Sequence, residues 1–208
     1  LFRDSKGFYW FGGANGLIRF TDPAGERHDA IWYRMGDKTY PLSHNRIRHI
    51  YEDKEQQLWI ATDGSINRYD YATRQFIHYN IVDNTGTYNT NWTYYIFEDT
   101  AGQLWISTCL GGIFVVDKRK LMQSTSGQYI AEQNYSVPNG LSGMFINQII
   151  PDNEGNVWVL LYNNKGIDKI NPRTREVTKL FADELTGEKS PNYLLCDEDG
   201  LLWVGFHG

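Results

Sequence analysis

The sequence predicts an all-β fold built from a repeated unit of four short antiparallel strands. A seven-residue frame recurs five times among the 208 residues: Asp, two residues, Gly or Gln, two residues, Trp. The frames begin and end at Asp4 and Trp10, Asp53 and Trp59, Asp99 and Trp105, Asp152 and Trp158, and Asp197 and Trp203. Successive frame Trp residues are 49, 46, 53 and 45 positions apart. Self-similarity at this period indicates a propeller or a solenoid.

The third copy allows each element to be assigned in order. Residues 93–98 are rich in β-branched and aromatic side chains, which predicts a first strand. Asp99 to Gly102 predicts a turn, because an Asp side chain can bond nearby backbone and Gly adopts positive φ. Residues 103–108 form the second predicted strand. The pair Gly111 and Gly112 then predicts a turn before a third strand over 113–117.

The second copy adds the fourth strand. Its predicted strands are 47–51, 58–62, 66–70 and 75–79, and the fourth recurs at 176–180 and less clearly within 127–135. Four antiparallel strands in about 48 residues fit a propeller blade better than a solenoid rung. We therefore predict an all-β chain of four-stranded antiparallel blades. About four to five blades over residues 1–208 would make one open or partial propeller, a portion of a longer chain.

The repeated residues have structural explanations. Each Trp can bury on the order of 150–250 Å² and is expected to fill the layer between adjacent blades. The frame Asp and Gly are expected to serve the turn and not catalysis. Gln56 replaces Gly in the second copy, which predicts a less regular turn there.

Composition and motifs argue against several functions. The net charge of −5 predicts no broad basic surface for nucleic acid. No apolar run approaches 18 residues, so we expect no membrane contact by this segment. The sequence shows neither a metal-ligand spacing nor a nucleophile, Walker or dinucleotide motif. It therefore predicts no catalytic residue, no metal and no cofactor, and Cys109 and Cys196 are expected to be free thiols.

Loops on one face of the predicted blades vary in sequence, which is where recognition tends to occur on a regular scaffold. This face gathers the links that lead into each first strand and the turns between second and third strands. Trp92 lies there, outside the frame, at the position that Arg46 and Phe145 hold in the neighbouring copies. Two interpretations stay open for Trp92: a stacking platform for a ligand ring, or a plug at the top of the central channel.

The other candidates for ligand contacts are polar or aromatic residues of the same loops. Their side chains could bind sugar hydroxyls or acidic groups, or could simply be solvated. Together with Trp92, the predicted ligand-binding residues are Arg46, Arg48, Asn91, Phe145 and Asn163.

The second and third copies resemble the two-component regulator propeller repeat. The pair Glu-Asp, the run Leu-Trp-Ile and, in the third copy, Gly-Gly-Ile occur in the order and spacing of that repeat, from Glu52 and from Glu98 onward. The last two copies depart from it, since Pro151 and Cys196 replace the Glu before the frame Asp. The resemblance covers nearly the whole chain and concerns the scaffold, so it assigns no ligand residue.

The resemblance implies a periplasmic sensor region of a hybrid two-component histidine kinase. Such regions bind oligosaccharides and control glycan-utilisation genes, with kinase activity elsewhere in the parent protein. The expected partners are an oligosaccharide, a neighbouring propeller and a second copy in a homodimer. Two alternatives remain: a structural or protein-binding propeller, and an enzyme of the streptogramin-lyase type, which shares a similar frame.

Overall fold

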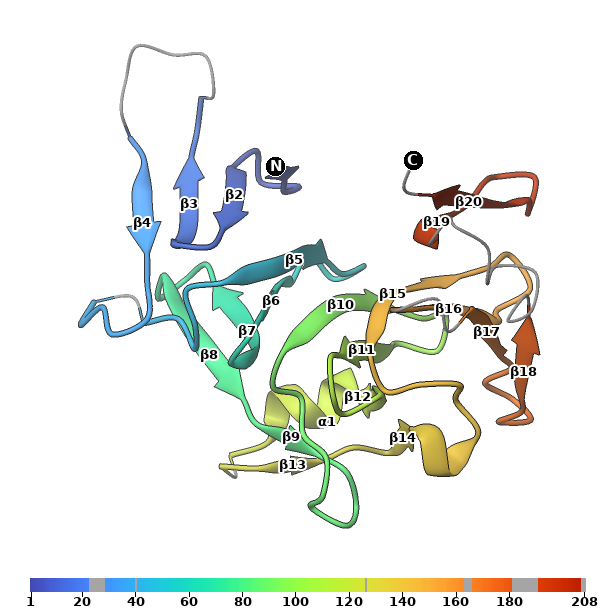
Figure 1. Ribbon diagram of the computed structural model, residues 1–208. Coiled ribbons are helices and arrows are strands. Elements are labelled where there is room, and N and C mark those ends of the chain that lie inside the picture. The colour runs from blue at the N-terminus through green and yellow to red at the C-terminus, as the bar shows by residue number, and fades with distance from the viewer. Residues whose placement is uncertain (23–28, 40, 126, 163–165, 181–190, 207–208) are drawn as a thin grey trace.

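A computed structural model describes residues 1–22, 29–39, 41–125, 127–162, 166–180 and 191–206. Four four-stranded antiparallel sheets are followed by a two-stranded sheet, and we call these blades one to five in chain order. Figure 1 shows the five sheets following one another around an arc. The predicted fold class, all-β with four-stranded antiparallel blades, is confirmed.

Blades one and two contain the first eight strands. These are β1 (Phe2–Arg3), β2 (Tyr9–Gly13), β3 (Gly16–Phe20), β4 (Ile31–Tyr33), β5 (Ile47–Glu52), β6 (Leu58–Thr62), β7 (Ser65–Asp70) and β8 (Gln75–Tyr79). Blade three contains β10 (Thr93–Glu98), β11 (Gln103–Thr108), β12 (Ile113–Asp117) and β14 (Gln133–Tyr135). Blades four and five contain β15 (Ile146–Pro151), β16 (Val157–Leu161), β17 (Ile167–Ile170), β18 (Val177–Leu180), β19 (Pro191–Cys196) and β20 (Leu202–Phe206).

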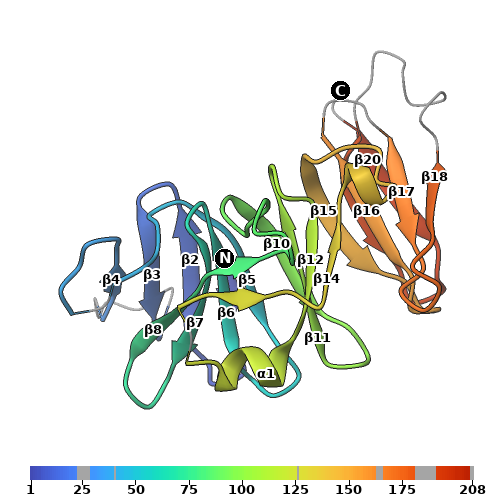
Figure 2. The same cartoon turned by 90° about the horizontal axis from the view of Figure 1, so that it is seen from below.

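Blade three carries additions that the repeat did not predict. A helix, α1 (Lys118–Gln123), follows β12, and a short 3-10 helix spans Val137–Asn139. Two short strands, β9 (Ile81–Val82) and β13 (Tyr129–Ile130), pair in parallel outside the blades. The region 127–135 therefore holds both β13 and the expected fourth strand, β14. Figure 2 shows α1 between β7 of blade two and β11 of blade three.

The frame Asp performs two tasks in every copy. One carboxylate oxygen accepts backbone N–H groups of the turn. In the first four copies, the donors are the residues two and four positions after the Asp, and in the fifth copy the donor is the residue four positions after it. The other oxygen accepts the indole N–H of the frame Trp, at 2.7, 2.9, 2.9, 3.0 and 2.6 Å from the first copy to the fifth. The turn role was predicted, whereas the bond to the indole was not.

The expectation of a less regular turn at Gln56 is wrong. Gln56 has a φ of 61°, in the left-handed region that the frame glycines also occupy. Its N–H bonds the carbonyl of Asp53 at 2.9 Å, as in the other copies. The bonds to the Asp53 side chain hold this backbone, although the left-handed conformation costs a non-glycine residue about 1 kcal/mol.

Apolar side chains fill the layers between adjacent blades. Trp10, Trp59 and Trp105 are buried in three such layers, which confirms the role predicted for them. Trp158 is partly buried between blades four and five, and Trp203 of blade five is 59% exposed. Both cysteines are free thiols, as predicted.

The Glu of the Glu-Asp pair connects its blade to the preceding one. Glu52 accepts the N–H of Ser5 at 2.9 Å, and Glu98 accepts the N–H of Lys54 at 3.0 Å. Ser5 and Lys54 each follow a frame Asp directly. Pro151 and Cys196 offer no carboxylate at this position, so the departures from the repeat remove these ties.

A second tie comes from the residue just beyond the third strand. Tyr71 donates its hydroxyl to Asp4 Oδ2 of the preceding blade at 2.6 Å. Lys118 is placed equivalently, and its ammonium lies 3.0 Å from Asp53 Oδ2 and 2.7 Å from Glu98 Oε1. Both contacts are buried ion pairs. Burial alone would lower the pKa of Lys118, but the carboxylates of Glu98 and Asp53 outweigh it and raise the pKa.

Replacing Lys118 should destabilise the protein strongly. Its side chain is only 2% exposed, and Lys118→Met would leave two buried carboxylates without their cation. We expect a loss of about 3–5 kcal/mol in the free energy of unfolding, measured by urea denaturation. Lys120→Met is the control, because that side chain is 66% exposed and its loss should cost less than about 1 kcal/mol. Equal losses in the two variants would contradict the role given to Lys118.

His49 ties blade two to blade three as a neutral side chain. Its Nδ1 accepts the N–H of Ile96 at 3.2 Å, and its ring stacks on Tyr95 with centroids 3.8 Å apart. Burial lowers the pKa of His49 to about 4 from the ordinary 6.5. Gln148 occupies the same place in blade four, where its Oε1 accepts the N–H of Leu194 at 2.7 Å.

Acid should weaken the fold through His49. The folded pKa lies below the unfolded one, so the stabilisation is complete above pH 6.5 and is lost as the pH falls toward 4. We expect this loss to be at most about 3 kcal/mol, measured by urea denaturation between pH 7 and 4. His49→Gln keeps an acceptor for Ile96 but does not titrate, so its stability should fall less over this range. An equal fall in the variant would refute the assignment.

Candidate ligand-binding face

The loops predicted to share one face do lie together. The carbonyls of Arg46, Trp92 and Phe145 accept the N–H groups of the following turns at 3.3, 3.0 and 3.0 Å, and the donors are Asp63, Cys109 and Tyr162. The three residues are therefore equivalent in blades two, three and four, as the sequence indicated. Asn163, the remaining loop candidate of blade four, lies outside the described residues.

Trp92 is held in an unusual backbone conformation. Its φ is 56°, in the left-handed region, and its side chain is 47% exposed. Two hydrogen bonds of 3.0 Å hold this backbone, from its N–H to the carbonyl of Asp63 and from the N–H of Cys109 to its carbonyl. A bulky residue in this region is strained, and such strain concentrates at functional sites. The backbone is thus fixed around a half-exposed indole.

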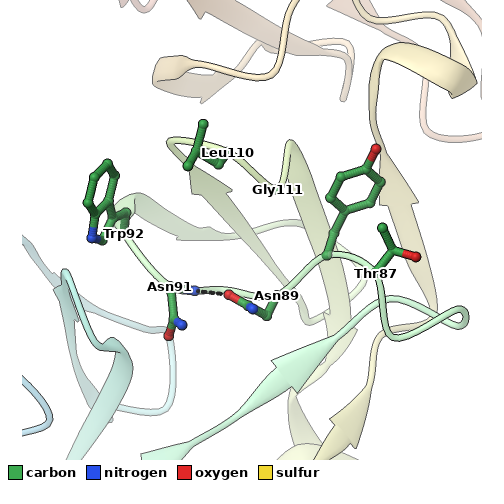
Figure 3. Close-up of a pocket in the computed structure, with 7 residues that line it drawn as sticks. Thr87, Asn89, Asn91, Trp92, Leu110 and Gly111 are labelled. Atoms are coloured by element: carbon green, nitrogen blue, oxygen red, sulfur yellow. Dashed lines mark hydrogen bonds between the residues drawn. The ribbon is translucent and has the colours of Figure 1, made fainter.

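A hollow of about 250 Å³ lies beside Trp92, and we call it the Trp92 hollow. It is lined by Thr87, Tyr88, Asn89, Asn91, Trp92, Leu110 and Gly111. Figure 3 shows Trp92 and Leu110 on one side of this hollow and Thr87 on the other. The Asn89 side chain accepts the backbone N–H of Asn91 at 2.9 Å, the dashed line in Figure 3. Asn91 and Trp92, which are consecutive in the sequence, both line this hollow.

A second hollow, of about 360 Å³, brings Arg48 and Phe145 together. We call it the bulge hollow, and its lining is Arg48, Tyr94, Cys109, Phe145, Ile146, Asn147 and Tyr162. The two hollows share the segments around Trp92 and Cys109, since neighbouring residues of these segments line each of them. Arg46 lines neither hollow. Its Nε lies 3.8 Å from Oδ2 of Asp63.

A β-bulge recurs in the first strand of blades two to five. In each of these blades, the register with the second strand shifts across a single residue. This residue is Arg48 in blade two, Tyr94 in blade three, Asn147 in blade four and Asn192 in blade five. Each of these residues stands five positions before its frame Asp. A bulge re-aims a side chain, and the first three of these residues line the bulge hollow. Sequence reasoning missed Tyr94 and Asn147, although their common offset with Arg48 was the signal that could have found them.

Asp63 fixes the guanidinium of Arg48. Arg48 donates from Nε and Nη2 to the two carboxylate oxygens at 2.7 and 3.3 Å, and its guanidinium lies 4.4 Å from the ring centroid of Tyr94. Burial would lower the pKa of Arg48, but the hydrogen bond to Asp63 outweighs it and raises the pKa. Burial also raises the pKa of the Cys109 thiol, which keeps it neutral. The hollow thus combines a fixed charged donor with aromatic rings.

The described residues contain no group of three His, Cys, Asp or Glu side chains that could hold a metal ion. Within the same residues, no helix has the length and apolar character needed to cross a membrane.

Comparison with known proteins supports the resemblance. Residues 41–64 match the family model described as two component regulator propeller. The extracellular domain of the hybrid two component system BT4673 from B. thetaiotaomicron is 99% identical, with a TM-score of 0.97. That alignment covers 100% of this chain and 28% of the other, so the chain spans little more than a quarter of that domain. No curated protein matches the chain.

More distant structures share the fold alone. The extracellular domain of the hybrid two component system BT3049 from B. thetaiotaomicron is 21% identical, with a TM-score of 0.77, over 99% of this chain and 27% of that one. Virginiamycin B lyase from Staphylococcus aureus is 17% identical, with a TM-score of 0.67, over 98% of this chain and 61% of the enzyme.

The backbone strain at Trp92 predicts an inverted order of stability. Trp92→Gly should be more stable than Trp92→Ala by about 1 kcal/mol, because glycine adopts positive φ without strain. Trp32 is the matched control, since it is also 47% exposed but lies in the strand β4. There, Trp32→Gly should be less stable than Trp32→Ala. Chemical denaturation of the four variants measures both differences, and the same order at both positions would contradict the argument.

Proposed function

Because this chain carries a two component regulator propeller repeat, we propose that it is part of the extracellular sensor region of a hybrid two component system and binds an oligosaccharide on its loop face. The alignment with the BT4673 domain supports the placement outside the membrane. Kinase activity and control of transcription would reside in other parts of the parent protein.

The observation that carries the sugar proposal is Trp92. A sugar ring presents C–H faces that pack on aromatic rings and hydroxyls that bond a few well-placed polar groups. Trp92 supplies a half-exposed indole, and Asn91 lies next to it in the same hollow. In the adjoining hollow, Arg48 is fixed by Asp63 and supplies a charged donor, and Asn147 supplies a side-chain amide.

Signalling would require that the sugar prefers one arrangement of the sensor region. A ligand shifts an equilibrium only by its differential affinity for the two states. The relevant states would be placements of neighbouring blades, of two propellers or of two subunits in a homodimer. The exposed cross-strand pair Leu195 and Trp203, 50% and 59% exposed, offers blade five an apolar surface for such a neighbour.

The test is thermal unfolding of the intact extracellular domain with a panel of defined oligosaccharides. A ligand that binds the folded state raises the melting temperature, and we expect a shift of several degrees with one glycan class. Trp92→Ala should abolish that shift, whereas Trp32→Ala, with equal exposure, should preserve it. If no glycan shifts the melting temperature, the proposal fails and a structural or protein-binding role is favoured.

A further inference from the structure

We propose that the bulge hollow is a second sugar subsite, and that a ring bound there holds blade four against blade three. The inference rests on the proposed function and assigns a separate task to this hollow. Arg48, Tyr94 and Cys109 line it from blades two and three. Phe145, Asn147 and Tyr162 line it from blade four, so an occupant touches both sides of the junction between blades three and four.

The first two junctions and the last one have directional polar ties. Glu52 and Tyr71 connect blade two to blade one, and Glu98 and Lys118 connect blades two and three. Between blades four and five, the Gln148 amide bonds both the N–H and the carbonyl of Leu194, at 2.7 and 3.0 Å. These bonds fix the relative positions of the blades that they join.

The junction between blades three and four lacks the equivalent ties. Thr100 follows the frame Asp of blade three, but Pro151 stands where a Glu would accept its N–H. Pro172 occupies the position that Tyr71 and Lys118 hold in the earlier blades. In each blade, this residue lies three positions after the third-strand residue that pairs with the frame Trp. Between these blades, the described residues do place the side chains of Tyr95 and Gln148 close enough to interact.

Apolar packing holds this junction instead. Phe97 and Trp105 of blade three pack with Ile149 and Val159 of blade four in one buried cluster. Hydrophobic contact is non-directional, so it opposes separation of the blades more than small sliding movements between them. A ligand with hydrogen bonds to both sides would add the directional contacts that the two prolines remove.

The lining of the hollow fits a sugar ring. Phe145 and Tyr162 are 43% and 58% exposed, so their faces are open to the C–H groups of a sugar. Arg48 supplies a charged donor and Asn147 a side-chain amide, and both groups suit sugar hydroxyls. The volume of about 360 Å³ falls within the range of small-ligand sites.

Binding and hydrogen exchange in the intact extracellular domain test the inference together. The probes are maltose, cellobiose, lactose and digalacturonic acid, with tetrasaccharides of the same linkages. For the sugar that binds, Tyr162→Ala should weaken binding about tenfold, as measured by calorimetry. Tyr193→Ala is the matched control, because Tyr193 is 56% exposed, does not line the hollow and should leave affinity unchanged. Amide exchange in β15 should slow on binding, while exchange in β2 of blade one, which contributes no residue to the hollow, should not.

A second variant tests the junction without relying on the loss of a contact. Pro151→Glu restores a carboxylate that can accept the N–H of Thr100. Exchange in β15 should then be slower before sugar is added, and the further slowing on binding should shrink. Unchanged exchange in this variant would show that the missing tie does not set the mobility of blade four, and would overturn the inference.

The remaining outcomes separate the two proposals. Binding that depends on Trp92 but not on Tyr162, with no change in β15 exchange, overturns the second subsite and leaves the proposed function standing. No binding of any probe by calorimetry overturns both.

Discussion

The hydrogen bond between the frame Asp and the indole of the frame Trp is the interaction on which the rest of the structure depends. The same carboxylate closes the turn and fixes the ring, so the turn and the layer between blades form together. Asp4 and Asp53 are each only 4% exposed. Losing either partner would therefore leave a buried polar group unsatisfied, which is costly.

The frame builds each blade, and a smaller set of residues decides how firmly blades are joined. Glu52, Glu98, Tyr71 and Lys118 reach back to the preceding blade. Pro151 and Pro172 occupy the corresponding positions of blade four and cannot do so. Blade four still forms its sheet despite these two prolines, but its attachment to blade three changes. The bulge hollow spans the same junction.

The candidate site uses backbone irregularities that the scaffold tolerates. The bulges at Arg48, Tyr94 and Asn147 turn side chains of three blades toward one hollow, and the left-handed backbone of Trp92 exposes its indole.

The sequence alone determined the blade, because its signals are local: alternating strand residues, Asp turns and a period near 48 residues. It also singled out Trp92 and Arg48 as candidates, and each of them lines one of the two hollows. It did not reveal Tyr94 and Asn147, the parallel pairing of β9 with β13, or the regular turn at Gln56. Those features depend on contacts between residues far apart in the chain. Only the tertiary structure could decide them, since a bulge, a left-handed residue or a shared hollow is set by the neighbours that packing brings together.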